Sequence, residues 1–342
     1  MTDYPETKKS SKRPVWAKRE VFLRKMETAR RWRGFLAIFI CVFLGFFIIN
    51  GAMRAISLKK YVSDSRWDEA MPFAAAISTT PPSVLVFNKG IGEIVVLKVP
   101  DELNVPTGDA TSPSIKVSDI NTGKGGEMNK VLTRVLGLDI QNYAVLKDKK
   151  DIDQATLEEA YRNFSSFSTL AAVVTVGKIP GIKSTNITRI DLLRLWWQVK
   201  LSGIKSPKII DLGQFLGSTL GPGGTQIEGL DSELLHQTIN KYFEIKNLAD
   251  QNIKLEVKNS SGAAGIGQLA GEIATSAGFN VTRVGTGEVK TAGCRIVAGS
   301  KNLRAVSYLA NIFKCDIVAP PSDAQGAPIM LDLGSDFAKS LF

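Results

Sequence analysis

Twenty consecutive residues without a charge, Gly34–Met53, constrain this chain more than any other feature. As a helix with a rise of ~1.5 Å per residue they would span about 30 Å, the thickness of the hydrocarbon core of a bilayer. A continuous apolar surface has no polar face to offer water, so a helix at the surface of a soluble domain is disfavoured. The sequence therefore predicts a transmembrane helix over residues 34–53.

The charges that flank this stretch predict its orientation. Residues 1–33 hold eleven Lys and Arg against four acidic residues, whereas only Arg54, Lys59 and Lys60 follow closely. The positive-inside rule then places the N-terminus in the cytoplasm. A cleaved signal peptide is the alternative, but its charged region would be too long and no clean small-residue cleavage motif follows. We expect a retained signal anchor in the cell membrane, with the bulk of the chain outside the cytoplasm.

The positive charge of the protein is concentrated in this tail. The formal net charge is +10, of which residues 1–33 carry +7, so the remaining chain is nearly neutral. A nearly neutral body argues against a nucleic-acid-binding surface, and no nucleic-acid partner is expected. The tail itself fits either a topology signal or the binding of anionic lipid head groups.

The length of 342 residues predicts two folded domains with an appendage. We expect an α/β fold class: a single N-terminal transmembrane helix, then two exported α/β domains with mixed sheets. The expected segments are a basic cytoplasmic tail (1–33), the transmembrane helix (34–53), a juxtamembrane segment with a short amphipathic piece at 66–76 (54–80), a first α/β domain (81–248) and a second one (251–338).

Residue patterns predict the elements of the first domain. Residues 83–100 read as two strands around a turn at Asn88–Gly92, and short strands are expected at 115–120 and 140–148. Helical periodicity is present over 127–139, 154–164 and 168–176, and further helices begin at the capping residues Thr188 and Asp231.

The helix that begins at Thr188 carries a tryptophan pair. Its apolar residues Ile190, Leu193, Trp197 and Leu201 recur at a spacing of three to four. Adjacent helix positions point about 100° apart, so Trp196 and Trp197 cannot form one flat platform for a carbohydrate. Packing of the pair in the core is favoured.

In the second domain, residues 257–273 combine a strand pattern, four glycines and a helical pattern. A phosphate-binding loop would end in Gly-Lys-Ser/Thr, but Gly267 is followed by Gln268. The glycines permit a tight strand-to-helix turn, whereas the free N–H groups of the helix could hold an anion or a glycan. Both interpretations stay open, and the candidate ligand residues are Asn259, Ser260, Ser261, Gly262 and Gly265.

Residues for common catalytic constellations are scarce. His236 is the only histidine, which excludes a histidine-based triad and a multi-histidine metal site. Cys41 lies in the apolar stretch, and Cys294 and Cys315 lack metal-ligand spacing, so no metal site is expected. Because each of these two cysteines opens a predicted strand beside one helix, they could form a disulfide; two buried free thiols are the alternative.

The second domain resembles the C-terminal domain of LytR-type proteins over about 85 residues. The resemblance is carried by glycine positions together with the order of strands and helices. The matching residues are Val257, Asn259, Ser260, Ser261, Gly262, Gly265, Ile266, Leu269, Ala270, Gly278–Val281, Ala305–Ala310 and Leu333–Asp336.

The preceding domain resembles, more faintly, the LytR-CpsA-Psr family. The matching stretches are LKVPDELNVP (97–106), GGEMNKVLTRVLGLDIQNYAVL (125–146), STNITRIDLLRL (184–195) and LDSELLHQTINKYF (230–243). The resemblance implies transfer of glycopolymers from a lipid-pyrophosphate carrier to peptidoglycan. It also implies arginines and aspartates around the pyrophosphate, usually with Mg²⁺.

The chain departs from the family at these functional positions. Thr80–Ser83 replaces an Arg-x-Asp, Asp101 stands where an arginine follows the proline, and the shortened segment 143–185 lacks an arginine-rich helix. We therefore expect no catalytic residues and no cofactor, and a role in binding or scaffolding at the cell wall, with peptidoglycan or a lipid-linked glycan as partner. The alternative is a divergent phosphotransferase of the cell envelope, for which Mg²⁺ would be required.

Overall fold

The structure, a computed structural model, describes residues 67–106, 114–175, 179–204, 206–220, 226–287, 291–299, 303–318 and 328–341. The expected basic tail, transmembrane helix and signal anchor lie outside these ranges. In the part of the chain that is described, no helix combines the length and apolar character needed to cross a membrane.

A six-stranded mixed sheet forms the first half, in the order β7-β6-β1-β2-β3-β8. The neighbours β1, β2 and β3 are antiparallel, whereas β1 pairs with β6 and β3 with β8 in parallel. The strands are β1 (Phe73–Ile77), β2 (Ser83–Asn88), β3 (Glu93–Lys98), β6 (Asn142–Leu146), β7 (Ile182–Thr185) and β8 (Lys208–Asp211). The predicted strand pair around Asn88–Gly92 and the strand within 140–148 are confirmed.

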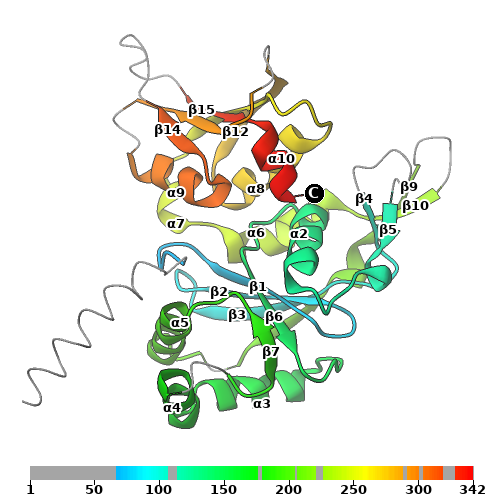
Figure 1. The fold of residues 1–342 in the computed structure, drawn as a ribbon, viewed down its shortest axis with the longest axis vertical. Coiled ribbons are helices and arrows are strands. Elements are labelled where there is room, and N and C mark those ends of the chain that lie inside the picture. The colour runs from blue at the N-terminus through cyan, green and yellow to red at the C-terminus, as the bar shows by residue number, and fades with distance from the viewer. Residues whose placement is uncertain are drawn as a thin grey trace, which may run out of the picture. The chain divides into compact units, whose positions relative to one another are not determined.

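Helices cover both faces of this sheet (Figure 1). One face is covered by α2 (Gly125–Leu136) and α6 (Ser232–Phe243). The other is covered by α3 (Gln154–Phe164), α4 (Phe167–Thr175) and α5 (Arg189–Leu201). Because side chains alternate along a strand, Ala74 and Ala76 of β1 join the core with α2 and α6, and Phe73 and Ala75 join the core with α5.

Strand β1 corrects the expectation for the segment before residue 81. We expected a juxtamembrane segment with an amphipathic piece at 66–76, but Phe73–Ile77 is a strand in the interior of the sheet. The sequence FAAAI carries no alternation, because β1 is buried on both faces. Pairing with β2 and β6 therefore decides its conformation, and the expectation of an amphipathic piece was wrong.

Helix α5 corrects the predicted apolar face. Residues Leu192, Leu195, Trp196 and Val199 are buried, whereas Trp197 and Leu201 are exposed. Apolar residues lie all around this helix, so their spacing alone could not choose the buried side. Core packing of the tryptophan pair is right for Trp196 and wrong for Trp197.

Side-chain caps begin the helices where the sequence predicted them. The Thr188 hydroxyl accepts a hydrogen bond from Asp191 N, and the Asp231 carboxylate accepts from Glu233 N and Leu234 N. Asp153 caps α3 in the same way, through the amide of Thr156. Each side-chain oxygen satisfies N–H groups that have no partner within the helix.

Two small ribbons accompany the first sheet. Strand β4 (Asn104–Pro106) pairs with β5 (Ser114–Lys116), and β9 (Leu216–Leu220) pairs with β10 (Gln226–Leu230). The strand expected at 115–120 was too long, because a 3-10 turn, Val117–Asp119, follows Lys116 directly. A second 3-10 turn, Leu212–Phe215, follows β8.

The second sheet has five strands in the order β12-β11-β15-β13-β14. Strands β11 and β12 are parallel around α8, and β13 and β14 are parallel around α9, as the repeated strand–helix–strand pattern predicts. The short helix α7 (Lys246–Ala249) leads into it. The other elements are β11 (Lys254–Asn259), α8 (Ile266–Ser276), β12 (Asn280–Thr286), β13 (Arg295–Val297), α9 (Leu303–Phe313), β14 (Asp316–Val318), β15 (Ile329–Leu333) and α10 (Ser335–Leu341).

Candidate functional site

An apolar cavity of about 560 Å³ lies between the first sheet and the helices α3, α4 and α5. Ligand pockets in proteins typically have ~300–1,000 Å³. The sheet and the helices both contribute aliphatic and aromatic side chains to the lining. Examples are Phe73, Ile77, Leu85, Phe87 and Leu146 from the strands, and Leu157, Tyr161, Phe164, Leu192, Leu195 and Val199 from the helices.

Small residues on the sheet create this space. Ala75 and Ala144 line the cavity from β1 and β6, and both are buried. Their partners on the neighbouring strands, Ile77 opposite Ala144 for example, are larger. A methyl side chain extends less far from the sheet than these larger neighbours, so Ala75 and Ala144 leave space beneath the helices. The alanine run of β1 thus places a cavity where a bulky strand would have given a closed core.

The polar groups of the cavity lining are satisfied within the protein. The Tyr161 hydroxyl donates to the carbonyl of Ile204 at 2.8 Å, and the Thr169 hydroxyl donates to the carbonyl of Asn163 at 2.6 Å. No Lys, Arg, Asp or Glu belongs to the described lining. The interior of the cavity therefore favours an apolar chain, which makes no demand for hydrogen bonds.

The end of the sheet where the resemblance implies an Arg-x-Asp is closed by hydroxyl groups. Thr79 and Ser83 are buried, and the Thr79 hydroxyl lies 2.6 Å from the Pro81 carbonyl and 2.9 Å from the Ser83 hydroxyl. The amide of Leu146 donates to the Ser78 hydroxyl at 2.8 Å. These hydroxyls bond to each other and to the backbone, so they hold the loop and present no cation.

The charged residues of this region also form ion pairs or hydrogen bonds within the protein. Lys98, paired in register with Ser83, forms an ion pair of 2.6 Å with Asp151. Asp153 caps α3, and burial together with Glu102 raises the pKa of Asp101. Of the carboxylates here, one neutralises a lysine and another holds a helix end. Mg²⁺ is usually held by one or two carboxylates together with waters and substrate phosphates, and Asp151 and Asp153 already bond to Lys98 and to the end of α3.

The candidate loop 259–265 is stabilised by hydrogen bonds between its own residues. The Asn259 side chain accepts from the amide and hydroxyl of Ser261, at 3.1 and 2.6 Å, and donates to the Ala263 carbonyl at 2.8 Å. Gly262 and Gly265 both have a φ of +78°, which favours glycine. The geometry therefore brings the five sequence-predicted residues together as a turn whose side chains bond mainly to the turn itself.

Ser260 joins a polar chain that the sequence did not reveal. Its hydroxyl donates to Asp332 Oδ1 at 2.5 Å, and Arg295 Nη2 lies 2.9 Å from Asp332 Oδ2. Asp332 is on β15 and Arg295 on β13, which pair directly in register. These residues are far apart in the sequence, so their contacts could be predicted only if the strand order were known.

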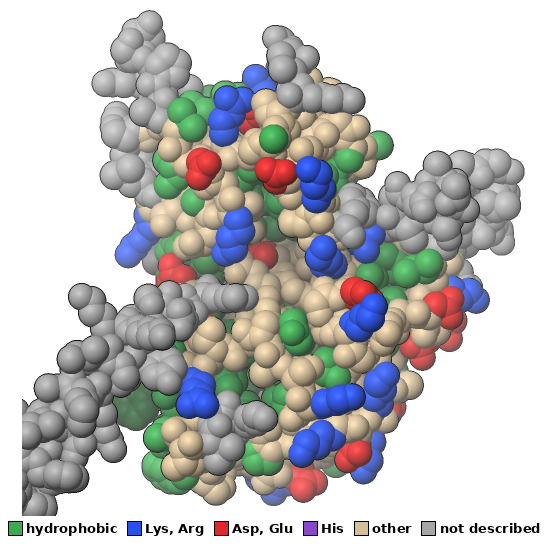
Figure 2. Space-filling view, in the orientation of Figure 1, with side chains coloured by type: hydrophobic (Ala, Val, Ile, Leu, Met, Phe, Trp, Pro, Cys, Tyr) green, Lys and Arg blue, Asp and Glu red, His purple; other side chains and the backbone are tan. Residues whose placement is uncertain are grey.

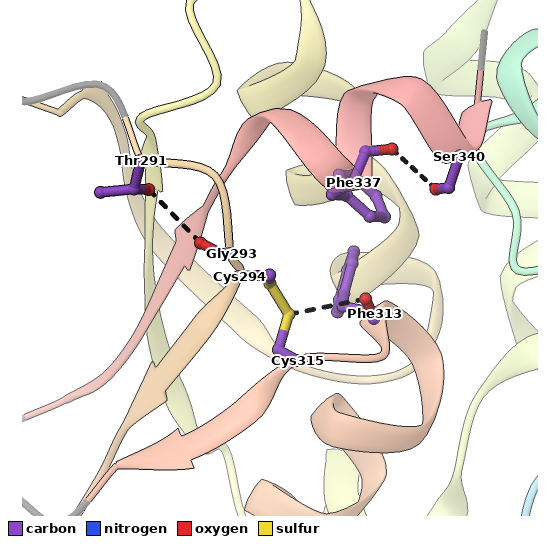
Figure 3. Close-up of a disulfide and its surroundings, with 7 residues drawn as sticks. All are labelled: Thr291, Gly293, Cys294, Phe313, Cys315, Phe337 and Ser340. Carbon is purple, nitrogen blue, oxygen red and sulfur yellow. Dashed lines mark hydrogen bonds between the residues drawn. A yellow bond between two sulfur atoms is a disulfide. The ribbon is translucent and has the colours of Figure 1, made fainter.

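Cys294 and Cys315 are bonded in a disulfide (Figure 3). Their Cα atoms are 4.7 Å apart, and the cysteines directly precede the parallel strands β13 and β14. Phe313 and Phe337 pack beside the bridge with ring centres 5.4 Å apart. No group of three or more potential metal-ligating His, Cys, Asp or Glu side chains occurs among the described residues.

The chain resembles known proteins in its structure and not in its sequence. No protein-family model and no curated protein matches the chain. The solved structures that it resembles are proteins of the LytR-CpsA-Psr family. TagV of B. subtilis has 14% identity and a TM-score of 0.38, over 51% of this chain and 98% of that one.

Two further structures show the same low similarity. TagT with bound octaprenyl pyrophosphate lipid has 12% identity and a TM-score of 0.33, over 53% of this chain and 92% of that one. Lin1025 of Listeria innocua has 12% identity and a TM-score of 0.33, over 51% and 97%. Likeness at this level says nothing of what this chain binds.

Proposed function

We propose that the protein is a membrane-anchored protein of the bacterial cell envelope, N-terminus inside, that binds the lipid part of a lipid-linked glycan without transferring it. The observation that carries the proposal is the cavity of about 560 Å³ under α3, α4 and α5. Its uncharged, largely apolar lining suits a polyprenyl chain, because burial of an apolar chain contributes ~25 cal/mol per Å². The predicted span at 34–53 would keep the protein beside such lipids.

The absence of transfer activity is part of this proposal. Cleavage of a pyrophosphate-linked sugar needs fixed donors or a metal to stabilise the charge that develops. Thr79 and Ser83 offer only hydroxyls that bond to each other and to Pro81, and Lys98 is held by Asp151. Peptidoglycan is the remaining candidate partner, through the turn Asn259–Gly265.

The test uses two exposed alanines of α3. Ala160 lines the cavity, whereas Ala155 does not. In the purified full chain, Ala160→Trp should weaken binding of a polyprenyl pyrophosphate at least tenfold, and Ala155→Trp should leave it unchanged. Equal affinity of both variants and the wild type would contradict binding in the cavity.

The same preparation separates binding from catalysis. With Mg²⁺ and a lipid-pyrophosphate oligosaccharide, we expect no released lipid phosphate above the background of a protein-free sample. Release that disappears on Asp101→Ala or Lys98→Ala would instead establish the phosphotransferase alternative.

A further inference from the structure

Helices α4 and α5 expose large apolar side chains outside the cavity. The exposed fractions are 71% for Phe167, 59% for Val174, 56% for Trp197 and 65% for Leu201. Figure 2 shows hydrophobic side chains at the lower left, where Figure 1 places these two helices. Apolar residues exposed singly are ordinary, but a group of them rimmed by polar residues marks an interaction surface.

Ring contacts join the aromatic residues of this group. The rings of Phe167 and Trp197 both contact the buried Trp196, with centre distances of 5.6 and 6.4 Å. Lys200 Nζ lies 5.8 Å from the centre of the Phe167 ring, and Leu201 is one helical turn beyond Trp197. We call Phe167, Val174, Trp197, Lys200 and Leu201 the α4–α5 patch. None of the five lines the cavity.

Helix α5 carries basic residues, neither α4 nor α5 has an exposed carboxylate, and Glu69, which precedes β1, pairs with one of these basic residues, Arg194, at 3.7 Å. Between Ala160 and Ile210 the sequence has eight Lys and Arg and a single acid, Asp191. Asp191 is fully buried beneath the N-terminus of α5. A surface with positive charges and no exposed carboxylate on α4 or α5 complements an anionic partner.

The chain enters the folded part on this same helix. The amide of Trp67 donates to Asp191 Oδ1 at 3.3 Å, and Arg194 Nη1 donates to the Trp67 carbonyl at 3.3 Å. Thirteen residues, 54–66, separate Trp67 from the predicted span 34–53. Even fully extended they reach at most about 45 Å. If the span is inserted, this length is the upper limit for the distance between the membrane and the end of α5 that Trp67 contacts.

We propose that the α4–α5 patch rests on the outer surface of the membrane, with Phe167, Trp197 and Leu201 at the level of the lipid head groups and Lys200 against anionic lipid. Aromatic side chains such as Trp favour this interface, and Lys and Arg are attracted to anionic head groups. Because α4 and α5 also roof the cavity, an acyl or prenyl chain could pass between bilayer and cavity without crossing water. This inference rests on the membrane anchor proposed above.

The experiment is lipid quenching of tryptophan fluorescence in the full chain. Protein is reconstituted into vesicles of phosphatidylcholine and phosphatidylglycerol whose acyl chains carry bromine near the head group. The difference between wild type and Trp197→Tyr isolates the Trp197 signal. We expect brominated lipid to lower that signal at least twofold, and Lys200→Glu to weaken the quenching.

A tryptophan placed elsewhere is the matched control. Ile317 of β14 is 58% exposed, close to the value for Trp197. In the Trp197→Tyr background, Ile317→Trp should give a signal that brominated lipid does not quench. Equal quenching at both positions would contradict a specific contact by the patch.

The outcomes separate the patch from the anchor. Flotation of the protein with vesicles reports anchoring, and quenching of Trp197 reports the patch. Flotation without quenching overturns the patch contact and leaves the anchor intact; absence of flotation overturns both. Quenching that appears only when the protein is diluted tenfold in lipid would show that a second copy covers the patch at the higher density, and would also overturn the contact.

Discussion

At the scale of single residues, glycine is required where the backbone turns between β11 and α8. Gly265 precedes α8 with φ +78° and ψ −17°, a left-handed conformation that costs other residues about 1–2 kcal/mol. A Cβ there would meet no atom within 4 Å, so the cost of a substitution comes from the backbone alone. A Cβ at Gly126 in α2 would also meet no atom within 4 Å, but Gly126 does not have a positive φ.

This contrast gives a matched pair of substitutions. Gly265→Ala should lower the free energy of unfolding by about 1 kcal/mol, because alanine disfavours positive φ. Gly126→Ala should leave it unchanged or raise it by about 0.5–1 kcal/mol, because alanine favours the helix. Denaturant melts of both variants measure the difference. If Gly265→Ala were neutral and lost only glycan binding, the turn would be a ligand site and not a structural device.

A second residue, Asp139, should make stability depend on pH. Burial raises the pKa of Asp139 to about 7, although a hydrogen bond from Gln141 and the charge of Lys314 both act to lower it. Its pKa in an unfolded chain is about 3.9, so between about pH 4 and 7 the folded state retains a proton that the unfolded state has lost. Stability should therefore fall as pH rises through this window.

The variant Asp139→Asn isolates this effect. Between pH 5 and pH 8 the wild type should lose on the order of 1–4 kcal/mol more stability than the variant, since each unit of pKa shift corresponds to about 1.4 kcal/mol. Urea melts at the two pH values give the comparison. Parallel losses in both proteins would mean that Asp139 is ionised in the folded state.

At the scale of elements, the disulfide fastens β14 to β13 at the border of the second sheet. Cys294 and Cys315 are 21 residues apart, and closing a loop of that size restricts the unfolded chain by about 3 kcal/mol in the chain-entropy model. A reducing agent should lower the melting temperature of the wild type by several degrees. The double variant Cys294→Ser/Cys315→Ser should start from the lower value and show no response. A response of equal size in the double variant would trace the effect to another cause.

The elements also show what the sequence could and could not predict. Helices α5 and α6 were placed by their caps, Thr188 and Asp231, because capping is local chemistry. Strand β1 was missed because its neighbours β2 and β6, and not its own pattern, decide its conformation. The buried side of α5 was missed for the related reason that apolar residues surround the helix.

The site was less predictable than the fold. The turn residues Asn259–Gly265 were found, because glycine and asparagine mark turns in any sequence. The cavity was not, since it depends on Ala75 and Ala144 lining the same face of the adjacent strands β1 and β6, and this pairing is not visible in the sequence. The run of alanines in β1 was a signal, but it has meaning only once the run is known to be a strand.

At the scale of the whole molecule, the proposed function requires that the folded part lie outside the cytoplasm. Protease added to intact, wall-stripped cells should degrade residues beyond about 60 and spare the basic tail, because eleven basic residues before the predicted span favour a cytoplasmic N-terminus. Immunoblots against the two ends of the chain measure this. A protected C-terminal end with a degraded tail would reverse the orientation.

Photocrosslinking can show whether a lipid chain enters the cavity under α3, α4 and α5. A polyprenyl pyrophosphate with a benzophenone near the end of its chain is bound to the purified full protein, irradiated, and mapped by mass spectrometry of the peptides. We expect crosslinks to the cavity lining on β1, β6 and α5, with loss of the signal in Ala160→Trp. Crosslinks on α2 and α6, which cover the opposite face of the sheet, or on residues 259–265, with none in the cavity, would contradict this expectation.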